Sequence, residues 1–156
     1  MVTLCSLKDD DIVNQIWRLQ HVAYRLEAER IGFEEIPPLM DTLDTLKSCG
    51  ESFYGWVEDD ELLGALAVQS ESPDSPDSLT LTRMMVHPDH FRKGIADSLM
   101  KHVLNEHRHI PLFIVSTGTL NTPAVALYQK HGFRPVSAAE VAPGVELTTY
   151  HLHNVK

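Results

Sequence analysis

The chain has 156 residues, of which 43% are hydrophobic and 22% charged, with 8 Gly and 9 Pro. This composition is typical of one globular domain, so we expect a single domain over residues 1–156 and exclude collagen-like and disordered classes. The formal net charge of −9 at pH 7 argues against binding nucleic acid or an anionic membrane through the overall field, and it is compatible with a cationic or amine-bearing partner.

Cysteine and histidine spacing gives no sign of a disulfide scaffold or a metal site. Cys5 and Cys49 are far apart, and the nine histidines include no H-E-x-x-H motif. The first eleven residues lack the charged and apolar regions of a signal peptide, and no apolar run approaches the 18 residues that indicate a membrane span. We therefore expect a cytoplasmic protein without a metal or a membrane partner.

The N-terminal third of the sequence predicts a short strand followed by a long helix. Residues 2–7 are rich in β-formers, and three aspartates follow as N-cap and first-turn residues. Apolar residues then recur at spacings of three and four, which predicts an amphipathic helix of about 18 residues. Gly32 and the Pro37-Pro38 pair end this helix, and residues 39–46 restart a shorter one.

The rest of the sequence predicts further strands and two more helices, which together indicate a mixed α/β domain. The strands are expected at residues 53–57 and 62–68, as a hairpin, and at residues 79–86, 111–115, 133–141 and 145–152. The strand at 111–115 is a continuous apolar run, as expected for a parallel strand covered on both faces. The helices are expected from Gly94 to about residue 107, and from Thr122-Pro123, as N-cap and first position, to Gly132.

The segment Val86–Ala96, VHPDHFRKGIA, combines a strand end, a turn and a helix start. Helix N-termini leave amide N–H groups unpaired and carry a partial positive charge, which favours an anionic ligand. Gly94 and Ala96 would let a diphosphate approach the backbone, and Arg92 and Lys93 add positive charge. A plain surface turn with two exposed basic residues remains the alternative.

A second block, NTPAVALYQKHGF at residues 121–133, follows the apolar strand. Together with VHPDHFRKGIADSLM it resembles the two signature blocks of the GNAT superfamily of acyl-CoA N-acetyltransferases, in the same order. The resemblance implies an α/β (α+β) fold with a central mixed, mostly antiparallel, twisted sheet of about seven strands. About four helices would flank this sheet, and two strands would splay apart at the CoA site.

The resemblance also implies acetyl-CoA as co-substrate and assigns site residues. CoA would be bound by Met85, Val86, Phe91, Arg92, Lys93, Gly94, Ile95, Ala96, Asn121, Ala124, Leu127 and Tyr128. Tyr128 matches the tyrosine that protonates the thiolate, and a main-chain N–H of Met85 or Val86 would contact the thioester oxygen. Asn121 would contact the pantetheine arm or cap the following helix. Phe91 departs from the family pattern, which often has Gln or Arg there, and this puts a side-chain contact to the phosphates in doubt.

The general base is less well determined, because the strand at 79–86 has no carboxylate. Glu27, Glu34 and Glu35, in or after the first helix, and Glu71 are candidates, and we assign Glu27. Solvated surface charges and a water chain remain alternatives. The acceptor pocket is expected to include Tyr24, Glu27 and Phe33.

The leading hypothesis is transfer of acetyl to a primary amine, either of a small molecule or of a lysine or N-terminal amine, by direct attack. A non-catalytic acyl-CoA sensor of the same fold is the alternative, favoured by Phe91 and the absent strand carboxylate. The final strands could form a homodimer contact.

Overall fold

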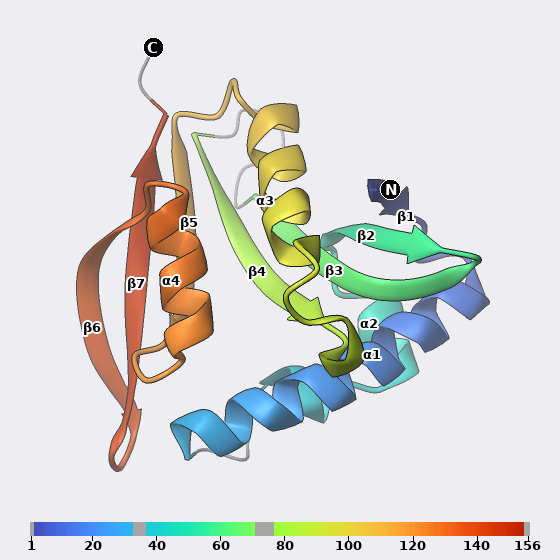
Figure 1. Cartoon of the computed structure of the whole chain (residues 1–156), viewed down its shortest axis with the longest axis horizontal. Helices are drawn as coiled ribbons and strands as arrows, with labels where there is room; N and C mark the ends of the chain where they lie inside the picture. Colours follow the sequence, from blue (N-terminus) through green and yellow to red (C-terminus); the bar gives the residue numbers. More distant parts are fainter. Residues whose placement is uncertain (1, 33–36, 71–76, 155–156) are drawn as a thin grey trace.

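The computed structural model describes residues 2–32, 37–70 and 77–154 and contains seven strands and four α-helices (Figure 1). The strands are β1 (Val2–Cys5), β2 (Ser52–Glu58), β3 (Glu61–Gln69), β4 (Ser78–Val86), β5 (Leu112–Gly118), β6 (Arg134–Ala142) and β7 (Val145–His153). The helices are α1 (Asp10–Ile31), α2 (Leu43–Lys47), α3 (Ile95–Glu106) and α4 (Thr122–Lys130), with short 3-10 segments η1 (Pro37–Met40) and η2 (Pro88–His90).

The seven strands form one mixed sheet in the order β1-β2-β3-β4-β5-β7-β6. Among the described strands, β4 and β5 are the one parallel pair, and every other pair is antiparallel. The expected fold class and the hairpin of β2 and β3 are therefore confirmed. None of the helices in the described residues is both long and apolar enough to cross a membrane.

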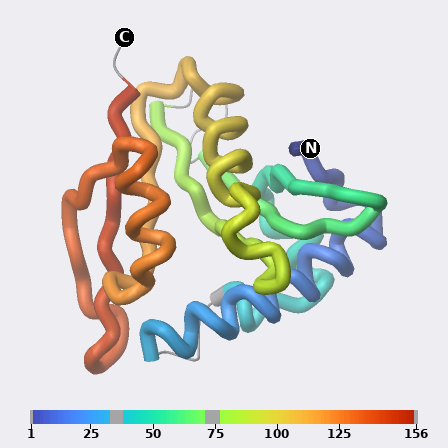
Figure 2. The backbone as a smooth tube through the Cα atoms, in the orientation of Figure 1, coloured from blue at the N-terminus to red at the C-terminus, as the bar shows by residue number. Residues whose placement is uncertain are grey.

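The apolar run in β3 is buried on both faces of the sheet, because side chains alternate along a strand and a β-bulge opposite Trp56 and Val57 shifts this alternation by one residue. Leu63 and Leu66 pack with α3, whereas Leu62, Ala65 and Ala67 pack with α1 and α2. Each face of the sheet therefore has its own hydrophobic core. In Figure 2, α3 and α4 lie side by side over one region of the sheet, and α1 runs past the end of β4.

Helix α1 is longer than the sequence pattern predicted, with 22 residues. It begins as expected, since the Asp9 carboxylate accepts hydrogen bonds from the N–H groups of Asp11 and Ile12. It continues to Gly32, whose φ of 71° ends it in the left-handed region. The additional turn carries Ile31 to β5, where a side chain at Gly118 would meet the Ile31 methyl group at 2.5 Å.

The start of α4 and the cover of β5 both differ from expectation. Asn121, rather than Thr122, occupies the N-cap position, and its side chain makes no capping hydrogen bond. In β5, Phe113 and Val115 are buried beneath α4, but the alternate residue Ile114 is half-buried and Ser116 is exposed. Helices therefore cover β5 fully on one face only.

Strands β4 and β5 are paired along only part of their length. Their register runs from Ser78 with Leu112 to Leu81 with Val115. Beyond these residues β4 continues to Val86 and β5 to Gly118, and the two strands separate, as Figure 1 shows. The expected splay is confirmed, and the gap exposes one edge of β4.

Candidate active site

A cavity of about 840 Å³ occupies the gap between β4 and β5 and extends to both sides of it. Its walls come from α1, β4, the loop before α3, β5 and α4. The structure brings most of the predicted site residues together in this wall: Tyr24, Glu27, Met85, Val86, Phe91, Arg92, Gly94, Ile95, Ala96, Asn121, Ala124, Leu127 and Tyr128. Lys93 is outside the wall, beside His90, and Phe33, Glu34, Glu35 and Glu71 lie outside the described residues.

The exposed edge of β4 presents main-chain hydrogen-bonding groups to this cavity. The N–H of His87 donates to the carbonyl of Leu63 in β3 at 2.8 Å. Because successive N–H groups of a strand point to opposite edges, the N–H of Met85 faces β3, and those of Met84 and Val86 face the gap. Of the two expected donors, Val86 therefore presents its N–H to the cavity.

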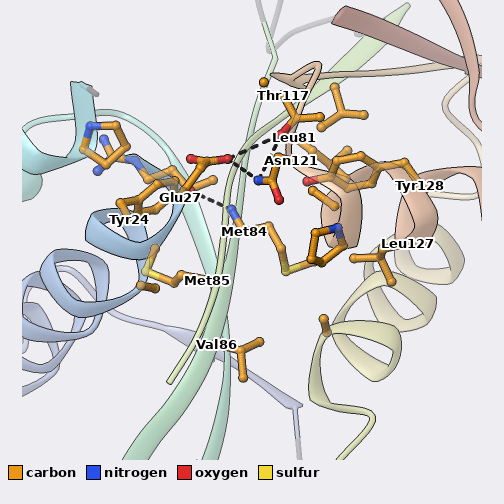
Figure 3. A pocket seen from close by; sticks show the side chains of 18 of the residues that line it. Tyr24, Glu27, Leu81, Met84, Met85, Val86, Thr117, Asn121, Leu127 and Tyr128 are labelled. Atoms are coloured by element: carbon orange, nitrogen blue, oxygen red, sulfur yellow. Dashed lines mark hydrogen bonds between the residues drawn. The ribbon is translucent and has the colours of Figure 1, made fainter. Parts of the chain in front are cut away.

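Glu27 reaches from α1 across the gap and contacts the start of α4. Its Oε1 accepts hydrogen bonds from Asn121 Nδ2 at 2.6 Å and from Thr117 Oγ1 at 3.4 Å (Figure 3). Burial raises the pKa of Glu27, and these two hydrogen bonds with the charge of Arg30 offset part of that rise. A carboxylate with a raised pKa is a stronger proton acceptor when it is ionised.

Tyr128 faces Glu27 from the opposite wall. The side chain is 4% exposed and packs against the rings of Phe133 and Tyr150. Burial, with a smaller contribution from the negative charge of Glu27, raises the pKa of Tyr128 above its ordinary value. The phenol therefore keeps its proton throughout the physiological range. Figure 3 shows its hydroxyl pointing into the gap.

A buried ion cluster beneath the α1 side of the cavity was not anticipated from the sequence. Arg83 of β4 contacts Glu51 with two nitrogens, at 3.0 and 2.7 Å, and its Nη1 contacts Asp41 at 2.5 Å and Gln20 at 3.0 Å. Thr82 also donates to Glu51. Burial disfavours the charged guanidinium, but Glu51 and then Asp41 outweigh it and raise the pKa of Arg83. In the sequence, the only indication of this cluster was Arg83 itself, a single cation inside an otherwise uncharged strand.

The loop from β4 to α3 has two residues in the left-handed region of backbone conformation. Arg92 has a φ of 65° and Gly94 a φ of 76°, so both lie in the left-handed region. Gly94 is the N-cap of α3 and has no side chain with which to cap the helix. The first N–H groups of this 12-residue helix therefore have no side-chain partner from the cap position.

Asp97 in the first turn of α3 fixes the position of α4. Its carboxylate contacts His131 Nε2 at 2.8 Å, Lys130 Nζ at 3.0 Å and Lys101 Nζ at 3.0 Å. These partners, Lys130 foremost, hold the pKa of Asp97 well below its usual range. These contacts tie α3 to α4, the helix that carries Tyr128.

Comparison with known proteins agrees with this architecture. The model of the Acetyltransferase (GNAT) family matches residues 13–133. The chain belongs to the GNAT acetyltransferase family.

Within the described residues, no group of three His, Cys, Asp or Glu side chains is placed to hold a metal ion.

Two curated relatives are each 33% identical to parts of this GNAT chain. UPF0157 protein YqkA of Bacillus subtilis matches over 153 residues, which are 98% of this chain and 43% of the relative. Peptidyl-lysine N-acetyltransferase YiaC of Escherichia coli matches over 84 residues, 54% of this chain and 51% of the relative. The chain thus spans about half the length of these relatives.

Solved structures share the fold of this GNAT chain at low sequence identity. The ribosomal-protein-S18-alanine N-acetyltransferase of Escherichia coli superposes with a TM-score of 0.76 at 17% identity, covering 100% of this chain and 96% of that one. The protein smu.2055 of Streptococcus mutans superposes with a TM-score of 0.78 at 20% identity, covering 99% of both chains.

Proposed function

We propose that this chain transfers the acetyl group of acetyl-CoA to a primary amine by direct attack, without a covalent enzyme intermediate. The observation that carries the proposal is the gap between β4 and β5, which has a carboxylate of raised pKa on one side and a buried phenol on the other. Family membership supports acetyl-CoA as the co-substrate.

The residues around the cavity fit a thioester of CoA. The α3 N-terminus would hold the diphosphate, and the space beside Gly94 is open, since a Cβ there would meet nothing within 4 Å. The pantetheine arm would lie along the open edge of β4, next to the N–H of Val86, and reach Ala124 and Leu127 on α4. The exposed ring of Phe91 lies in the same wall. CoA supplies an activated acyl carbon, and the protein must position it and move two protons.

Glu27 and Tyr128 would move these protons at opposite ends of the reaction. Glu27 accepts a proton from the amine, whose nitrogen forms a bond to the acyl carbon. As the carbon–sulfur bond breaks, the Tyr128 hydroxyl donates its proton to the departing sulfur. Asn121 and Thr117 hold the Glu27 carboxylate through the two hydrogen bonds described above.

The acceptor is proposed to be a cationic amine, of a small molecule, a lysine or a peptide N-terminus. On the α1 side of the cavity wall, the acids Asp41, Glu51 and Glu27 exceed the cations Arg83 and Arg30 by one negative charge when all are ionised. The name of the relative YiaC, a peptidyl-lysine N-acetyltransferase, supports a lysine acceptor.

Location and assembly remain predictions from the sequence. We propose a cytoplasmic protein that forms a homodimer. The edge strand β6 supports a dimer contact, because its residues from Arg134 to Val141 are exposed, with Val136 and Val141 each 51% exposed.

Calorimetry with CoA and release of its thiol across a panel of amines test the proposal. We expect CoA to bind and the thiol to be released with saturation in one class of amine. Gly94→Val should weaken the binding of CoA at least tenfold, because the valine side chain would fill the space of the diphosphate. Gly144→Val is the matched control, since Gly144 has a φ of 75° and equally open surroundings outside the cavity wall. Binding without turnover would favour the sensor, and no CoA binding would refute both functions.

Glu27→Gln is expected to lower kcat/KM by about 10²–10⁴ and to remove the acidic limb of its pH profile. In the parent protein activity should rise with pH as Glu27 loses its proton, and the raised pKa places this limb above the range of an ordinary glutamate. The groups that face this carboxylate and shape the limb are Tyr24, Arg30, Thr117, Asn121 and Tyr128.

Glu29→Gln is the control for this variant, because Glu29 is exposed on the same helix and absent from the cavity wall. The penalty of Glu27→Gln should shrink for amines of low pKa, which arrive already neutral. An unchanged acidic limb in Glu27→Gln would remove Glu27 from the role of base.

A further inference from the structure

Tyr24 makes a contact that a residue lining an acceptor pocket does not require. Its hydroxyl oxygen accepts a hydrogen bond from the main-chain N–H of Met84 at 2.9 Å. This N–H belongs to the edge of β4 from which β5 has separated. The phenol of α1 is therefore held at the open backbone edge where a thioester would lie, as Figure 3 shows.

The hydrogen of the same hydroxyl remains available. Within the part of the chain that the structure describes, Tyr24 oxygen has Met84 as its hydrogen-bond partner, and its own O–H has no acceptor. The side chain is 8% exposed and lines the cavity. An O–H whose oxygen already accepts a hydrogen bond is a stronger donor, because the two bonds polarise each other.

The charges around Tyr24 keep it protonated. Burial, then the nearby groups Glu27 and Tyr128, raise its pKa, and the bond from Met84 with the charge of Arg83 offsets only part of this. Tyr24 and Tyr128 both line the cavity, Tyr24 from α1 and Tyr128 from α4. Two phenols in one cavity wall can serve two atoms of the same thioester, its oxygen and its sulfur.

We propose that the Tyr24 hydroxyl, oriented by the N–H of Met84, donates a hydrogen bond to the acyl carbonyl oxygen and stabilises the negative charge that develops there during attack. This inference rests on the proposed function. It makes Tyr24 a catalytic residue rather than a lining residue of the acceptor pocket. The N–H of Met84 donates a hydrogen bond to the Tyr24 oxygen, and the Tyr24 O–H donates one to the acyl oxygen. No proton is transferred in this step. When the carbon–sulfur bond breaks, the electron pair on the oxygen re-forms the carbonyl double bond, and the negative charge leaves with the sulfur, which Tyr128 protonates.

Tyr24→Phe tests the inference, because it retains the ring and removes the donor. Loss of one such donor typically lowers kcat by about 10²–10³, and we expect this loss with KM for acetyl-CoA changed less than about threefold. Tyr54→Phe is the matched control: Tyr54 is also 8% exposed, but its hydroxyl contacts His107 at 3.0 Å, away from the cavity. Urea unfolding of both variants measures any loss of folding.

A binding measurement separates the carbonyl contact from a structural effect. Two probes are used: a ketone analogue of acetyl-CoA with a methylene in place of sulfur, and S-ethyl-CoA, which has no carbonyl. We expect the parent protein to bind the ketone about five- to tenfold more tightly than S-ethyl-CoA, and Tyr24→Phe to lose most of this preference, with the N–H of Val86 as the remaining donor.

The outcomes distinguish this inference from the proposed function. If Tyr24→Phe keeps the preference for the ketone, or turns over faster than the parent, the phenol merely occupies the Met84 N–H and the inference is wrong, although the proposed function stands. If neither probe binds the parent protein, the proposed function fails and the inference fails with it.

Discussion

Replacing Arg83 by methionine is expected to destabilise the fold by about 3–5 kcal/mol, the range found when one partner of a buried ion pair is removed. The side chains of Arg83, Asp41 and Glu51 are only 10%, 15% and 8% exposed. Without the guanidinium, two carboxylates would remain in a poorly solvated site with no cation. Urea unfolding, extrapolated to zero denaturant, measures the change.

The expected loss depends on the two acids as well as on the cation. Arg83→Met combined with Glu51→Gln should recover part of the stability, because one of the two uncompensated charges is gone. Arg83→Lys should be intermediate, since it keeps the charge but cannot contact both Glu51 oxygens. A loss below about 1 kcal/mol for Arg83→Met would contradict the argument.

Tyr128→Phe is expected to lower kcat by about 10²–10³ while the affinity for CoA changes less than about twofold. The ring and its contacts with Phe133 and Tyr150 are retained, so the variant removes the proton donor and little of the packing. Rates of CoA thiol release at saturating amine, together with calorimetry, separate turnover from binding.

The role of Tyr128 differs from that of Glu27 in a way that amines can reveal. Tyr128 would act on the departing sulfur. The loss of kcat in Tyr128→Phe should therefore be the same for amines of high and low pKa, unlike the loss in Glu27→Gln. Tyr150→Phe is the control, since Tyr150 is buried beside Tyr128 but does not line the cavity. Equal turnover in Tyr128→Phe and the parent protein would exclude this donor.

Local sequence patterns identified the elements because each depends on neighbouring residues. The Asp9 cap, the apolar spacing of α1 and the two signature blocks are local features, and they gave element types and most bounds. The end of α1 at Gly32 was predicted, but its length was underestimated, because the apolar pattern is weak after Leu26 although Ile31 lies against Gly118. Asn121 was left open between a pantetheine contact and a helix cap. Its side chain makes no capping hydrogen bond and donates to Glu27, a partner 94 residues away that no local pattern reveals.

The sequence by itself determined the family, the order of strands and helices, and the two segments that frame the proposed cofactor site. Tertiary structure decided that Glu27 lines the cavity, which β4 amides face the gap, and that Arg83 is surrounded by Asp41, Glu51 and Gln20. The physical reason is range: helix caps and periodicity act over a few residues. Desolvation of Glu27 and the contact of Tyr24 with Met84 arise only when α1 packs against the strands of the sheet.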